Sequence, residues 1–239
     1  MPKTQRQYLI AGACIVWFIA VQAFQEVAYR FWIPASHGPF DDLSIYLLRI
    51  DKIRALLLMA SILTLILPYS VIALRYFKTR PLASICGFFF SAAFIGLEMI
   101  TRSVDFFVVG QSWARQFSTT ANGAEREIIL QHLGTWNEVA YALYFPLMLS
   151  YLLASLAFLT STVGETGNLR WLVQAAFALN ALRLLGRMLS TFAGQAWLAP
   201  LNDTAYFPTV LLVNLLLASW FFRLARGPVD DSGGGQQLA

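Results

Sequence analysis

Charge is what this sequence lacks most. Asp, Glu, Lys and Arg together make up 13% of its 239 residues, against about 25% in a typical soluble domain. Hydrophobic residues make up 58%, and the mean hydropathy is +0.60. So much apolar surface argues strongly against a soluble globular protein and excludes a disordered chain. The composition indicates an integral membrane protein whose first partner is the lipid bilayer.

Cysteine and histidine are also rare, with two residues of each. Cys14 and Cys86 lie inside apolar runs and are expected to be buried without forming a disulfide. His37 and His132 do not form a His-rich metal pattern, so no metal site and no cofactor are predicted. The pairs Ser161-Thr162 and Ser190-Thr191 have no His or Lys partner at a triad-like separation, so no catalytic residues are predicted and an enzyme is not favoured. The net charge of +4 comes without a basic, aromatic-rich patch, so no nucleic acid is expected as a partner.

What the sequence does have is six apolar runs, each close to the ~20 residues that a helix needs to cross a bilayer. They predict an all-α bundle of six transmembrane helices as a single domain over residues 1–226. The Gly-rich residues 227–239 are predicted to be a disordered cytoplasmic tail. The predicted spans are about 8–25, 53–74, 82–107, 139–159, 169–192 and 206–224.

Basic residues orient this bundle, since short cytoplasmic loops carry an excess of Lys and Arg. Dense basic segments occur at the N-terminus, in the turn Arg75–Arg80, at Arg170, and at Arg223 and Arg226. This pattern predicts that both termini are cytoplasmic. It leaves two long outer loops, 26–52 and 108–138, with a short amphipathic helix expected at the end of the first.

The most informative residues are ionisable groups inside the predicted spans or at their outer edge. Such groups are expensive in hydrocarbon, so they are expected to face inward and to pair. The third span carries Glu98 and Arg102 one helical turn apart, and the fifth carries Arg183 and Arg187 at the same spacing. We expect Glu98 to pair with Arg183 or Arg187 across the bundle. The predicted polar cluster comprises Glu98, Arg102, Asp105, Glu138, Asn180, Arg183 and Arg187, with a secondary set of Glu26, Arg30, Asp51 and Arg54.

Two functional hypotheses follow from this cluster. In the first, it lines a pocket in the outer leaflet that binds a lipid or a small anionic or amphipathic ligand, in a sensor or a small transporter. Two arginines on one helix stripe favour this hypothesis, because one acid cannot neutralise both at short range. In the second, the charges only hold the helices in register, in an accessory subunit that packs against another membrane protein. The balance of five acids against five arginines favours the second hypothesis.

Three local patterns carry a resemblance. They are a basic turn, Arg75-Tyr-Phe-Lys78, an acid late in the third span, Phe94-Ile-Gly-Leu-Glu98, and a polar start to the fourth span, Trp136-Asn-Glu138. Over roughly residues 50–225 the chain resembles a group of uncharacterised bacterial six-helix membrane proteins. The resemblance implies a multi-pass protein of the bacterial inner (plasma) membrane and implies no activity.

Overall fold

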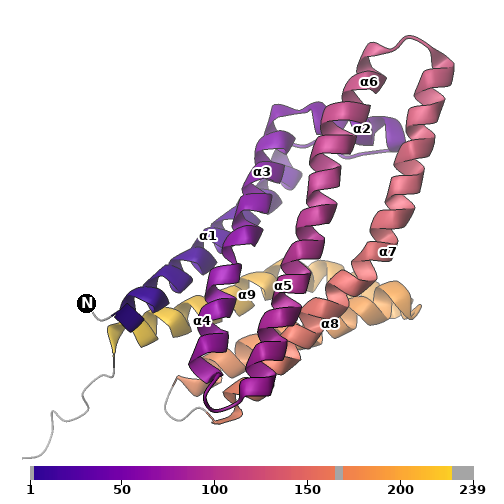
Figure 1. The fold of residues 1–239 in the computed structure, drawn as a ribbon. Helices are drawn as coiled ribbons and strands as arrows, with labels where there is room; N and C mark the ends of the chain where they lie inside the picture. Colours follow the sequence, from indigo (N-terminus) through magenta and orange to yellow (C-terminus); the bar gives the residue numbers. More distant parts are fainter. Residues whose placement is uncertain (1–2, 165–168, 228–239) are drawn as a thin grey trace, which may run out of the picture.

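A computed structural model describes residues 3–164 and 169–227 of the chain (Figure 1). Helices make up nearly all of the described chain, which contains no strand. They are α1 (Lys3–Phe31), α2 (Pro39–Leu47), α3 (Arg49–Thr64), α4 (Ile66–Tyr76), α5 (Pro81–Ser103), the π-helix η1 (Val104–Trp113), α6 (Ala114–Thr119), α7 (Gly123–Ser161), the short 3-10 turn η2 (Thr162–Gly164), α8 (Arg170–Phe192), the 3-10 turn η3 (Ala196–Leu198) and α9 (Ala199–Arg226).

Six helical segments are long and apolar enough to cross a membrane, which confirms the predicted all-α bundle of six spans. They are Thr4–Phe31, Arg49–Tyr76, Pro81–Thr119, Gly123–Ser161, Arg170–Phe192 and Ala196–Arg226. Five of these segments run further than the predicted spans, because polar residues beyond the apolar runs continue the same helices, whereas the fifth matches its prediction to within one residue. Nearly all of the predicted tail, 228–239, lies outside the described residues.

The second span is broken at Leu65, between α3 and α4. Pro68 follows three residues later. Its ring removes the hydrogen bond to the carbonyl of Thr64 and crowds that carbonyl. The chain responds with a tighter turn, in which the Leu65 amide donates to the Ile62 carbonyl at 3.1 Å. The proline therefore places a bend in the middle of this span.

The prediction of a long outer loop over residues 108–138 is wrong, because these residues are almost entirely helical. The third span continues through η1 and α6 to Thr119, and α7 begins at Gly123, where the Asn122 side chain accepts a hydrogen bond from the Ala124 amide at 3.0 Å. Each arm of this hairpin has 39 residues, a length of about 58 Å against about 30 Å of hydrocarbon. In Figure 1 its tip rises well above the other helices.

The projecting hairpin folds because it has a small apolar core of its own. Helix α2 lies across it and contacts η1 and α6. The buried members of this core are Leu43, Val109, Ala114, Ile129 and Leu133. The polar residues that made this stretch look like a loop lie on the outside of a packed pair of helices.

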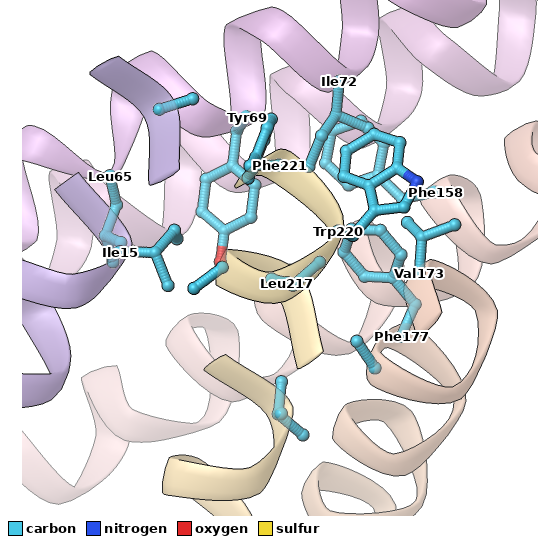
Figure 2. Close-up of a cluster of buried hydrophobic side chains, with 14 of the residues drawn as sticks. Ile15, Leu65, Tyr69, Ile72, Phe158, Val173, Phe177, Leu217, Trp220 and Phe221 are labelled. Carbon is cyan, nitrogen blue, oxygen red and sulfur yellow. The ribbon is translucent and has the colours of Figure 1, made fainter. Parts of the chain in front are cut away.

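The main core lies at the other end of the bundle, where α1 starts and α9 ends side by side (Figure 1). We call this the closed end and the opposite end the open end. Phe158, Trp220 and Phe221 are completely buried here, and Tyr69 stacks on Phe158 with ring centroids 5.8 Å apart (Figure 2). Gly87 lets α5 approach Phe158, since a Cβ at Gly87 would lie 2.7 Å from that ring. This end is tightly packed.

Candidate functional site

A cavity of about 310 Å³ lies between the six spans toward the open end. We call it the central cavity. Every span contributes to its wall, so the whole bundle surrounds it. Its charged and amide-bearing lining residues are Gln22, Gln25, Glu26, Arg54, Glu98, Arg102, Asn180, Arg183 and Asn214. Six residues of the predicted clusters are therefore gathered around one space.

The remaining predicted residues lie elsewhere at the same end. Asp51 and Asp105 line a small adjoining hollow of about 80 Å³. Arg30 lines a wider depression above the cavity. Glu138 is exposed on α7, and Arg187 lies beside α9 near the surface. The predicted cluster is thus divided among several environments.

Arg54 is the most firmly held of the arginines. Its Nη2 lies 2.7 Å from Asp51 Oδ1, and its Nη1 donates to Gln25 Oε1 at 2.7 Å. Gln25 Nε2 donates back to the Arg54 carbonyl at 3.1 Å, and the Tyr29 ring covers the guanidinium with its centroid 4.5 Å away. The Arg54 and Asp51 side chains are only 10% and 4% exposed. This buried network joins α1 to α3.

Glu98 does not pair with Arg183 or Arg187, so the predicted interhelical pair is wrong. Its Oε1 lies 2.9 Å from Nη2 of Arg102, one turn further along the same helix. Arg102 Nη1 also lies 3.7 Å from Asp105 Oδ2. The intrahelical partner prevails because positions four apart on a helix are already neighbours, whereas a partner across the bundle depends on how two helices are rotated.

Asp105 carries this network to the next helix. Its Oδ1 accepts a hydrogen bond of 2.8 Å from the Trp136 indole nitrogen on α7. Arg102 therefore faces two carboxylates, one of which is also bound by a neutral donor. The Glu98–Arg102–Asp105 group is a connected network along the third span that is anchored to α7.

The two arginines of α8 differ sharply. Arg187 Nη1 lies 2.7 Å from Asp203 Oδ1, a carboxylate in the first turns of α9 that is 69% exposed. Arg183 has no carboxylate within ion-pair distance in the part of the chain that the structure describes. Its Nε and Nη2 both donate to Asn180 Oδ1, at 3.3 and 2.9 Å, and the Tyr206 ring centroid lies 5.0 Å from its guanidinium carbon.

Asn180 is itself held in place from the next helix. Its Nδ2 donates to Ser155 Oγ on α7 at 2.8 Å, and its side chain is buried. The amide oxygen is thereby aimed at Arg183. The arginine is oriented by neutral groups on three helices but is not neutralised by them.

The central cavity adjoins a depression on the outside of the bundle. A depression of about 530 Å³, the vestibule, is walled by residues of the α1–α2 connection, by α2 and by Leu133 and Asn137 of α7. Tyr29 and Arg54 line the vestibule, the small hollow and the central cavity alike. These two side chains therefore stand at the boundary between the vestibule and the cavity.

Tyr46 of α2 faces the same boundary from above and lines both the vestibule and the small hollow. Burial, followed by the nearby carboxylates Asp105 and Asp51, raises the pKa of its phenol well above the usual value. Both effects disfavour a phenolate. Tyr46 therefore adds an uncharged phenol to the lining of the vestibule and the small hollow.

Several residues that line the cavity were not predicted from the sequence, although those on α1 form a recognisable pattern. Gln22, Gln25 and Tyr29 line the cavity beside Glu26, which belongs to the predicted secondary set. Their spacing of three, four and seven residues is that of one helix face. Reading the stripe of α1 as a polar face would have placed it on the cavity wall. Tyr206 and Asp203 left no comparable pattern.

The described residues contain no group of three or more His, Cys, Asp or Glu that could hold a metal ion. Comparison with family models, curated proteins and solved structures gives no match to the chain. The fold and the helix lengths define a multi-pass membrane protein.

Proposed function

We propose that this protein binds a small anionic or amphipathic ligand in the central cavity, as a sensor or a small transporter. The observation that carries the proposal is the state of Arg183, which lines a cavity surrounded by six spans and has only neutral partners. An arginine within a membrane bundle normally pairs with an acid, because its charge is costly in hydrocarbon. A bound anion would supply the missing charge.

The lining of the cavity supports an amphipathic ligand. Phe94, Leu147, Met148 and Leu184 form apolar wall on the same cavity to which Arg183 contributes its charge. Ligand sites are typically concave and mostly apolar, with a few polar groups that fix the orientation of the ligand. The combination suits a molecule with one charged end and an apolar body.

The Arg54–Asp51–Gln25 network favours a structural role for part of the charge, as the accessory-subunit hypothesis expects. Every group in that network is bonded inside the protein and buried. The hypothesis of a purely structural cluster leaves Arg183 without an explanation. We therefore retain it for Arg54 and not for the cavity as a whole.

We further propose that both termini lie in the cytoplasm of a bacterial cell and that the vestibule opens away from it. The proposal is supported by the basic turn Arg75–Arg80, the basic start of α1 and the basic C-terminal turn of α9, which all lie at the closed end. A reporter enzyme that works only in the cytoplasm should be active when it is fused after Arg226. A signal from the opposite side would invert the bundle and place the vestibule on the cytoplasmic face.

Thermal unfolding of the purified protein in nanodiscs tests the binding proposal. Anionic, neutral and cationic amphiphiles of similar size are compared for their effect on Tm, because a ligand that binds only the folded state raises Tm. Anions should stabilise the wild-type protein and the control Arg187→Gln, but not Arg183→Gln. Equal shifts for all three proteins would refute binding at Arg183.

A further inference from the structure

The number of unmatched charges in the cavity limits the charge of its ligand, and this inference rests on the proposed function. Glu26 is 2.6 Å from Arg30, Arg54 is 2.7 Å from Asp51, and Glu98 is 2.9 Å from Arg102. Arg183 is then the one charged group of the cavity lining, as described, without an opposite charge within ion-pair distance. One uncompensated cation calls for one negative charge.

The geometry of Arg183 also limits the shape of the charged group. Asn180 Oδ1 occupies the side of the guanidinium formed by Nε and Nη2. Nη1 has no hydrogen-bond partner among the described residues, and Nη2 has a second hydrogen. The end formed by Nη1 and Nη2 can therefore bind two oxygens side by side, which is how arginine binds a carboxylate. A phosphate monoester would bring nearly two negative charges to this single cation.

The wall around Arg183 limits the rest of the ligand. The Tyr206 ring lies against the guanidinium, and Phe94 and Tyr151 stack with centroids 4.2 Å apart on the cavity wall. Leu184 lies one residue beyond Arg183 on α8 and lines the same space. The volume of about 310 Å³ falls at the small end of the range for ligand pockets.

We propose that the central cavity selects small monocarboxylates with an apolar body, and that the carboxylate binds end-on to Nη1 and Nη2 of Arg183. The apolar body lies against Phe94, Tyr151 and Leu184. A second carboxylate on the ligand would find no unpaired cation in the cavity, because Arg54 and Arg102 already face carboxylates of the protein. A neutral amide loses the charge-assisted hydrogen bonds, and an ammonium group faces the like charge of Arg183.

The test uses four eight-carbon probes that differ only in their polar ends: octanoate, octanedioate, octanamide and octylammonium. Dissociation constants are measured with the protein in nanodiscs, with empty nanodiscs subtracted. Octanoate should bind saturably and about tenfold or more tightly than each of the others. Equal binding of octanoate and octanedioate would overturn the selection for a single charge.

Variants of Arg183 test whether this residue binds the carboxylate of octanoate. Arg183→Gln keeps a donor for Asn180 and should weaken octanoate binding by about tenfold to a hundredfold. Arg183→Lys keeps the charge but not the paired donors, and should bind with intermediate strength. Arg187→Gln changes the other arginine of α8, which does not line the cavity, and is the matched control that should bind as the wild type does. Unchanged octanoate binding in Arg183→Gln would overturn the assignment.

The two proposals fail in different ways. If other anions stabilise the protein through Arg183 while octanoate does not bind, the selection for monocarboxylates is wrong and the proposed anion site stands. If no anion of any kind stabilises the wild-type protein, the proposed function itself is wrong.

Discussion

The two ends of this bundle are held together by different interactions. At the closed end, large rings such as Phe158 and Trp220 fill the space between the helices and leave no exposed surface. At the open end, the helices separate around a cavity and are joined by ion pairs and amide hydrogen bonds. Lipid tails are as apolar as leucine, so apolar side chains gain little by leaving lipid for a helix interface. Close packing therefore holds the closed end, whereas ion pairs and hydrogen bonds hold the open end.

This contrast predicts that single substitutions act differently at the two ends. At the closed end, the loss of stability should depend on the volume removed and on the exposure of the side chain. At the open end, it should depend on whether the substitution leaves an opposite charge without a partner.

Arg54→Met should be the most damaging change at the open end. It leaves the Asp51 carboxylate buried with no cation and removes the hydrogen bond to Gln25. Stranding a buried charge typically costs about 3–5 kcal/mol. Unfolding by SDS titration measures the free energy. The control is Arg30→Met, since the Arg30 side chain is 68% exposed and a surface pair contributes about 0–1 kcal/mol. Similar losses in the two variants would contradict the prediction.

Phe158→Ala should reduce the free energy of unfolding by about 3 kcal/mol, because it opens a cavity in the closed end. Phe158 is completely buried and contacts α4, α5 and α8 through Tyr69, Gly87 and Phe177. Phe89→Ala is the matched control, since Phe89 is 64% exposed on α5. The control should change stability by less than about 0.5 kcal/mol. If both variants lose the same stability, close packing is not what holds this end.

Glu98→Ala should cost about 1 kcal/mol, which is less than breaking a fully buried pair. Arg102 is 38% exposed and keeps Asp105 at 3.7 Å, so its charge is not stranded. Adding Asp105→Asn should increase the loss by more than that substitution costs alone, since Arg102 then has no carboxylate. A double-mutant cycle measures this coupling, and strictly additive losses would show that the two acids do not share Arg102.

Arg183→Gln should leave the free energy of unfolding within about 0.5 kcal/mol of the wild type. No carboxylate is stranded by the change, and the new amide can still donate to Asn180. Unfolding is measured without ligand, so that only the empty cavity is compared. A large loss would mean that Arg183 is part of the structural framework of the open end.

The positions of the helices could be predicted because the bilayer imposes their length. An apolar run of about 20 residues has few alternatives to a transmembrane helix. The projecting hairpin was missed for the same reason, since residues 108–138 are too polar for the bilayer and their helical structure depends on contacts with α2. Apolar periodicity finds spans more readily than helices outside the membrane.

The gathering of charges at one end was also predictable from depth along each span, but their pairing was not. Glu98 and Arg102 pair within one helix, and Arg187 pairs with Asp203, a residue that lies outside the predicted spans. Pairing across the bundle depends on helix rotation and on the start of α9 at Ala199. Neither can be read from the residues of a single span.

Helix α7 has a mechanical consequence. It runs unbroken from the projecting tip at Gly123 past the cavity to Phe158 in the closed end, with Pro146 inside it. Pro146 removes the hydrogen bond to the Ala142 carbonyl, which makes that turn the most compliant part of the rod. From there to Gly123 is about 35 Å, so a tilt of about 5° would displace the tip by about 3 Å. A small change in the cavity wall at Tyr144 and Leu147 would therefore be enlarged at the tip of the hairpin.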